Sequence, residues 1–165
     1  MSQIPLPQRH GELARPGPRN LLAALSWILL VAVIFGGYSL LRMLASTDEL
    51  SPFQERFFRA GHAHAGVLTA VGLLYSNSLN HTTLTYRKQV WAWLVYALGV
   101  GCVSGGFFLH MAIGKEGAAS AGTALTTAGA VVIVAMALYL AWHLFRARNI
   151  ADHSVSTSHQ TGDSR

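Results

Sequence analysis

Three of the eight histidines occur where a metal ion or a haem iron could be bound. Two of them, His62 and His64, lie in Arg59-Ala-Gly-His-Ala-His-Ala-Gly-Val-Leu68 at the start of an apolar run, and His110 lies near the end of the next run. Imidazole nitrogens ligate haem iron and copper. Residues two apart on a helix point about 200° away from each other, so His62 and His64 cannot bind one ion from the same face. Either they serve two different neighbours or only one of them is functional.

The elements that position these histidines are long apolar segments. Four runs, over residues 21–41, 58–79, 90–113 and 118–145, are apolar apart from the histidines and a few flanking charges. Each has about the 20 residues needed to cross the hydrocarbon core of a bilayer. We therefore predict an all-α fold, an integral membrane four-helix bundle over residues 21–145. The flanking residues 1–20 and 146–165 are expected to be disordered cytoplasmic tails.

The distribution of basic residues predicts the orientation of the bundle. Both termini and the loop between the second and third runs carry eight Lys and Arg residues, and the other two loops carry four. Basic residues in short loops favour the cytoplasmic side. Both termini are therefore predicted to be cytoplasmic, in a bacterial inner membrane. The net charge of +5 reflects this topology, and nothing indicates nucleic-acid binding.

The second helix has a clear start signal outside the membrane. Ser51 is a candidate N-cap, Pro52 suits the first helical position, and Gln54 follows three residues after the cap. Helix two should then run inward and helix three outward, which places His62, His64 and His110 at a similar depth near the outer face.

Small residues lie next to two of these histidines. Gly66 follows His62 by one helical turn and Gly106 precedes His110 by one turn, which predicts space beside each imidazole for a flat macrocycle. The same glycines could instead serve helix packing alone, and Gly101-x-x-x-Gly105 is a pattern that lets membrane helices approach closely. We expect His81 and His143, at the opposite ends of the spans, to be ordinary interfacial residues.

The stretch Gly61-His-Ala-His-Ala-Gly-Val-Leu68 resembles the His-x-His helix of haem–copper oxidase catalytic subunits, in which the two histidines ligate different haems. The chain lacks that family's further spans and copper-ligand histidines, so the resemblance does not imply oxygen reduction. The longer stretch from Phe58 to Leu68, set in four spans, also resembles a group of small bacterial four-helix membrane proteins. That resemblance implies a fold and a location but no activity.

Three functions remain open at this point. The first is non-covalent haem b, with His62 or His64 and His110 as axial ligands, for electron transfer or redox sensing. The second is a cofactor-free accessory or assembly subunit that docks on a respiratory or other membrane complex, or forms a homo-oligomer. The third is an outer-face copper site that uses the same histidines with Met111 or Met43. Besides the lipid bilayer, the sequence indicates no specific partner or substrate.

Overall fold

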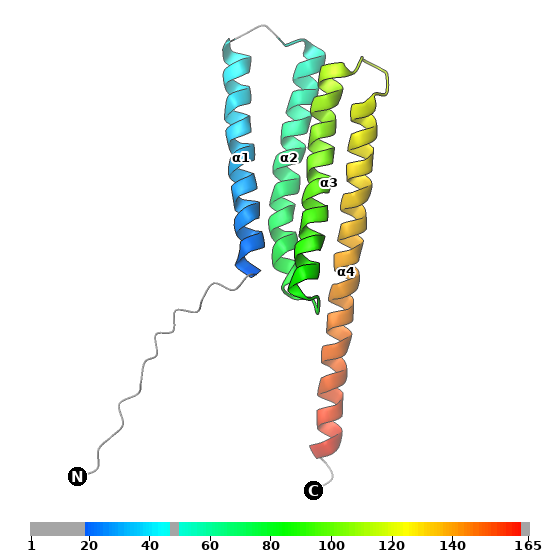
Figure 1. Cartoon of the computed structure of the whole chain (residues 1–165). Coiled ribbons are helices and arrows are strands. Elements are labelled where there is room, and N and C mark those ends of the chain that lie inside the picture. The colour runs from blue at the N-terminus through cyan, green and yellow to red at the C-terminus, as the bar shows by residue number, and fades with distance from the viewer. Residues whose placement is uncertain (1–18, 47–49, 163–165) are drawn as a thin grey trace, which may run out of the picture.

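The computed structural model describes residues 19–46 and 50–162, which form four long helices. They are α1 (Arg19–Ser46), α2 (Pro52–Leu79), α3 (Tyr86–Ile113) and α4 (Ala121–Gly162). The helices run alternately up and down, joined by short connections (Figure 1). The described residues contain no strand, so the all-α prediction is confirmed for this part of the chain.

Three of these helices are long and apolar enough to cross a membrane. They are α1 over Asn20–Met43, α3 over its full length, and α4 over Ala121–Asn149. Helix α2 has the same 28 residues as α3, but its sequence includes Glu55, Arg56, Arg59 and the two histidines. Three helices therefore support an association with a membrane, and a crossing by α2 is part of the proposed function.

The helices pack in chain order. Helix α2 contacts α1 on one flank and α3 on the other, and α3 also contacts α4. Contacts between α1 and α3, or between α2 and α4, are sparse, and none join α1 to α4 among the described residues. The four helices therefore form an open row (Figure 1). This arrangement leaves a groove on each side of the central α2–α3 pair.

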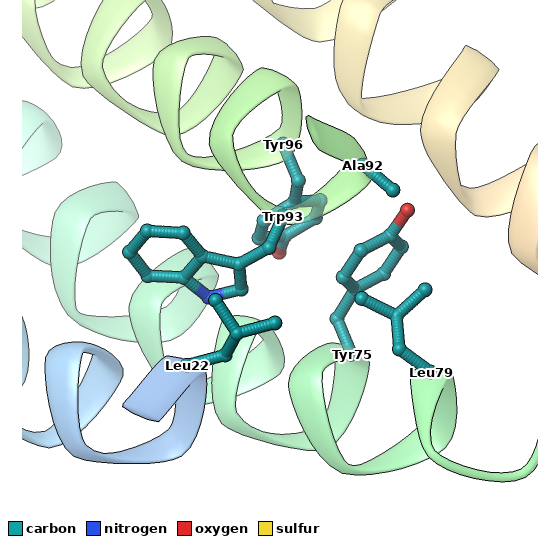
Figure 2. Close-up of a cluster of buried hydrophobic side chains, with 6 residues drawn as sticks. All are labelled: Leu22, Tyr75, Leu79, Ala92, Trp93 and Tyr96. Atoms are coloured by element: carbon teal, nitrogen blue, oxygen red, sulfur yellow. The ribbon is translucent and has the colours of Figure 1, made fainter. Parts of the chain in front are cut away.

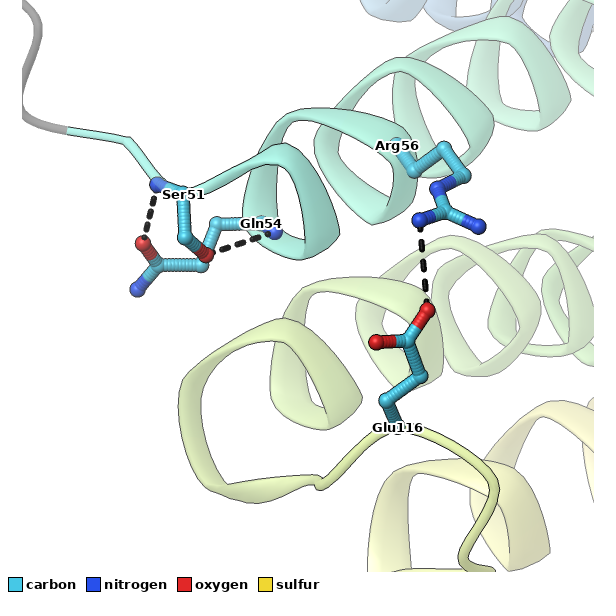
Figure 3. A network of polar contacts seen from close by, with 4 residues as sticks. All are labelled: Ser51, Gln54, Arg56 and Glu116. Atoms are coloured by element: carbon cyan, nitrogen blue, oxygen red, sulfur yellow. Dashed lines mark hydrogen bonds and ion pairs between the residues drawn. The ribbon is translucent and has the colours of Figure 1, made fainter.

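The predicted start of α2 is confirmed. The Ser51 side chain accepts a hydrogen bond from the Gln54 backbone N–H (3.3 Å), and the Gln54 side chain accepts one from the Ser51 N–H (3.0 Å) (Figure 3). This capping box fixes the first turn of the helix. Nearby, Arg56 forms an exposed ion pair with Glu116 of the α3–α4 connection at 3.3 Å (Figure 3).

The largest buried cluster lies at the opposite end of the helices, near the α2–α3 connection. Its members come from α1, α2 and α3 and are Leu22, Tyr75, Leu79, Ala92, Trp93 and Tyr96 (Figure 2). The buried Gln89 side chain donates to the carbonyls of Leu79 (3.0 Å) and Leu84 (3.1 Å). These bonds satisfy carbonyl groups at the end of α2 and in the connection that follows it, so this end of the molecule is firmly held.

Glycines make the contact between α3 and α4, but they are not the pair that the sequence suggested. A Cβ atom added at Gly106 would lie 2.6 Å from the Gly122 carbonyl oxygen, and one added at Gly129 would lie 2.7 Å from the Gly99 carbonyl oxygen. Added at Gly101 or Gly105, it would meet nothing within 4 Å. The predicted packing role of the Gly101–Gly105 pair is therefore wrong, because neither glycine lies in close contact with another helix.

The end of α4 also differs from expectation. The helix continues to Gly162, whereas we expected a disordered tail from residue 146 (Figure 1). Residues 146–161 contain neither proline nor glycine, so no strong helix breaker occurs before Gly162. The predicted N-terminal tail lies almost wholly outside the described residues, and Arg19 and Asn20 belong to α1.

Candidate functional site

His62 faces α1. A Cβ atom added at Gly37 would lie 2.6 Å from His62 Nε2, and one added at Gly36 would lie 4.0 Å from its Nδ1. The imidazole therefore fills a niche that exists because α1 has no side chain at these two positions. His62 thus belongs to the α1–α2 contact.

His64 lies on another side of α2, as the two-residue spacing required. Its Nδ1 is 2.7 Å from the Ala60 carbonyl oxygen, and its ring stacks on Phe107 of α3 with centroids 4.7 Å apart. A carbonyl only accepts hydrogen bonds, so Nδ1 is the donor in this contact, and in the neutral ring the lone pair would then lie on Nε2. The residue is exposed on the flank of the helix row.

His110 is buried, with 7% of its surface exposed, where α3 meets α4 and the start of α2. Its Nδ1 lies 2.6 Å from Ser120 Oγ, and its ring packs against Phe57 with centroids 4.4 Å apart. Ser120 Oγ also accepts a hydrogen bond from the Gly122 N–H at 3.0 Å. The imidazole is therefore anchored to the α3–α4 connection by a short polar network.

The structure thus separates His62 from the other two histidines. His64 and His110 are linked through the rings of Phe107 and Phe57, which are 6.3 Å apart, whereas His62 contacts α1. The predicted space beside Gly106 is filled by the α4 backbone, and a Cβ at Gly66 would make an ordinary 3.7 Å contact with Val33. No group of three or more His, Cys, Asp or Glu side chains is arranged for a metal among the described residues. A haem held jointly by His62 and His110 therefore does not fit this arrangement.

A pocket of about 270 Å³ lies between α1, α2 and α3. Apart from a few hydroxyl and aromatic groups, its wall is made of small or aliphatic residues: Ser26, Leu29, Ala32, Val33, Ala65, Thr69, Gly72, Trp93, Tyr96, Ala97, Val100, Gly101 and Ser104. On α3 it extends from Trp93 to Ser104, around the middle of the helix. Because α1 and α3 barely touch, the pocket is open between these two helices.

Three polar residues of the pocket wall differ in whether their side chains make a hydrogen bond. The Trp93 indole N–H donates to Ser26 Oγ at 2.9 Å, and the Tyr96 hydroxyl donates to the Leu68 carbonyl at 2.9 Å. Ser104 Oγ is buried and has no hydrogen-bond partner. Because this oxygen has less than 1 Å² of accessible surface, it does not face the open space of the pocket.

Neither family models nor curated proteins nor solved structures match this chain.

Part of the pocket wall is visible in the sequence as a stripe of small residues on α2. The stripe below His62 that includes Ala65, Thr69 and Gly72 is small and weakly polar, and the structure uses all three as pocket wall. Ser26 and Ser104 had no comparable signal, because their roles depend on which helices become neighbours. Of the two histidines that we expected to be ordinary interfacial residues, His81 is exposed, and His143 packs on Tyr139 with a buried Nδ1 that lacks a partner.

Proposed function

We propose that this chain is a four-span membrane protein of the bacterial inner membrane that binds a small apolar molecule taken from the bilayer. The observation that carries the proposal is the pocket of about 270 Å³ between α1, α2 and α3. Ligand sites in proteins are typically concave and mostly apolar, with a few polar groups. A dry cavity of about 150 Å³ is sufficient for benzene, so this pocket has room for one substituted ring or a short chain segment.

The access route supports a membrane-soluble ligand. The gap between α1 and α3 runs beside Gly101, at which an added Cβ would meet nothing within 4 Å. A molecule moving in the hydrocarbon region could enter there without crossing a polar surface.

The test is photolabelling of the purified protein in lipid nanodiscs with an alkyl diazirine that carries no oxygen atom. We expect saturable attachment to pocket residues of α1, α2 or α3, mapped by mass spectrometry. Ala65→Phe should abolish it, because the new ring would occupy the pocket. Ala63→Phe is the matched control, since Ala63 is exposed on another side of α2 and does not line the pocket. Labelling that stays proportional to probe concentration, or that Ala65→Phe leaves intact, would overturn the proposal.

A second candidate is ligation of haem b or copper by His64 and His110. It is favoured by the Nδ1 bond of His64 to Ala60, which leaves Nε2 free in the manner of metal-bound histidines. A planar macrocycle between these residues would have to displace the rings of Phe57 and Phe107. An accessory-subunit role has no specific observation in its favour.

An absorption spectrum tests this second candidate. With an ample haem supply during expression, the purified protein should show a Soret band that His64→Ala or His110→Ala removes. His143→Ala should leave the band unchanged, because His143 lies on α4 far along the helix from the α3–α4 connection at which His110 is held. A colourless wild-type protein that also contains no copper by elemental analysis would refute this candidate and leave the pocket proposal intact.

The orientation belongs to the same proposal. Both termini are placed in the cytoplasm by the excess of Lys and Arg on that side. A cysteine at Arg87, introduced in a Cys102→Ser background, should react with an impermeant thiol reagent only after the cells are opened. Labelling of intact cells would reverse the orientation.

A further inference from the structure

We propose that a groove between α3 and α4 binds one anionic phospholipid, with the lipid phosphate at Lys88 and an acyl chain along the groove. The groove has a volume of about 310 Å³ and is lined by Lys88, Trp91, Ala92, Val95, Met136 and Tyr139. It shares no lining residue with the α1–α2–α3 pocket. It is therefore a second site, separate from the one in the proposed function.

The side chains along this groove change from cationic to apolar in the order of the groups of a phospholipid. Lys88 lies in the first turn of α3, and Val95 lies seven residues, or about 10 Å, further along the same face. Trp91, which is 63% exposed, lies between them. Trp and Tyr side chains are typical of the level of the lipid head groups. Phosphate, glycerol esters and acyl chain would therefore meet a cation, an aromatic ring and an aliphatic side chain in turn.

The charge at the cationic end of the groove is not neutralised by the protein. Lys88 is exposed and forms no ion pair within the part of the chain that the structure describes. Residues 80–149 include one acidic residue, Glu116, which follows the opposite end of α3. A further cation, Arg146, lies two turns beyond Tyr139 on the same side of α4. A phosphate group would supply the missing counter-charge, as anionic lipids do for basic residues at a membrane surface.

The deeper end of the groove favours a lipid over a soluble anion. Helices α3 and α4 are both long and apolar enough to cross a membrane, so the groove between them runs into the hydrocarbon region when they span a bilayer. There it is lined by Val95 and Met136, which offer no charged partner. An acyl chain continues from the head group into this region, whereas a free anion would contact only the Lys88 end.

The experiment is native mass spectrometry of the detergent-purified protein with phosphatidylglycerol and phosphatidylcholine that carry the same acyl chains. We expect one tightly bound lipid and a preference of about 5-fold for phosphatidylglycerol, the usual effect of one basic residue near anionic lipid. Lys88→Gln should remove this preference, and Lys88→Arg, which keeps the charge, should retain it. Equal binding of the two lipids by wild-type protein would overturn the proposal without recourse to any variant.

Lys115→Gln is the matched control for the charge. Lys115 is the only other lysine of the chain and is also exposed, but it lies in the α3–α4 connection at the opposite end of these helices. Its replacement should leave the preference for phosphatidylglycerol unchanged. If the two lysine substitutions reduced the preference equally, the lipid would be attracted by surface charge in general, and the proposed site would be wrong.

Val95→Phe tests the acyl-chain part of the groove. The larger ring would fill the deeper end, so the binding of both lipids should fall while the preference between them remains. Leu98→Phe is the control, because Leu98 is 65% exposed and does not line the groove. Unchanged binding of both lipids by Val95→Phe would indicate a site for a free anion and would overturn the assignment to a lipid.

Discussion

Helices α1 and α4 flank the same central pair, but they are attached to it in opposite ways. Helix α4 meets α3 along a line on which Gly106 faces Gly122 and Gly99 faces Gly129, so the two backbones touch. Helix α1 reaches its neighbours through side chains, mainly by the His62 niche and the Ser26–Trp93 hydrogen bond. Along the line of glycines the α3–α4 contact leaves no room for a ligand, whereas the contact of α1 with its neighbours borders the α1–α2–α3 pocket.

The comparison shows that glycine has two uses in this molecule. On α3 and α4 the glycines are seven residues apart, so they recur on one face every two turns and form a seam between the helices. On α1 the adjacent Gly36 and Gly37 make a niche for one imidazole. Small residues alone therefore do not reveal whether a helix face is packed tightly or left open.

The largest effect is expected at the seam. Gly106→Ala places a Cβ atom 2.6 Å from the Gly122 carbonyl oxygen and 2.6 Å from the Thr126 nitrogen, and backbone atoms cannot turn aside as a side chain can. We expect destabilisation by about 3 kcal/mol, the upper end of ordinary overpacking. Unfolding of the detergent-purified protein, followed by heating or denaturant, measures it.

Gly105→Ala is the control for this substitution. It changes the adjacent residue by the same methyl group, yet the added Cβ meets nothing within 4 Å. Stability equal to or slightly above wild type is expected, because alanine favours the helix. If Gly105→Ala were as damaging as Gly106→Ala, the seam would lie on a different face of α3.

The sequence predicts where the helices lie better than it predicts which helix faces pack against each other. The capping box at Ser51 follows from a local pattern and is confirmed, and α2 and α3 end at Leu79 and Ile113, where the apolar runs of the sequence also end. The packing role predicted for Gly101 and Gly105 was wrong, because the Gly-x-x-x-Gly spacing does not specify which face meets a neighbour, whereas the packing alternative for Gly106 agrees with its contact to Gly122. The packed face is decided by Gly122 and Gly129 on another helix.

The same limit applies to the candidate site. Helical geometry predicted that His62 and His64 lie on different faces of α2, as observed. It could not predict that His62 contacts α1 or that His64 stacks on Phe107 of α3. The depth argument that joined His62 to His110 ignored the direction of the rings. The pocket depends on contacts among three helices, so only fragments of it could be seen in the sequence.

A smaller effect is expected where α1 is attached. Ser26→Ala removes the acceptor of the Trp93 indole N–H in a site where Ser26 is 2% exposed. The unpaired N–H should cost about 1–2 kcal/mol. Trp93→Phe in the same chain removes the stranded donor, so the double variant should be more stable than the sum of the two single losses predicts. Strict additivity would mean that this bond does not hold α1 in place.

The smallest effect is expected at the niche, where Gly37→Ala tests how firmly α1 is held. The added Cβ would lie 2.6 Å from His62 Nε2, but the obstacle is the far end of a side chain that can rotate. The cost should be about 1 kcal/mol, well below that of Gly106→Ala. His62→Ala, which empties the niche, should cancel most of the cost of Gly37→Ala in a double-mutant cycle. If Gly37→Ala destabilised the protein as much as Gly106→Ala, and if His62→Ala did not relieve the loss, α1 would be held as rigidly as α4. The proposed entry of a ligand between α1 and α3 would then be contradicted.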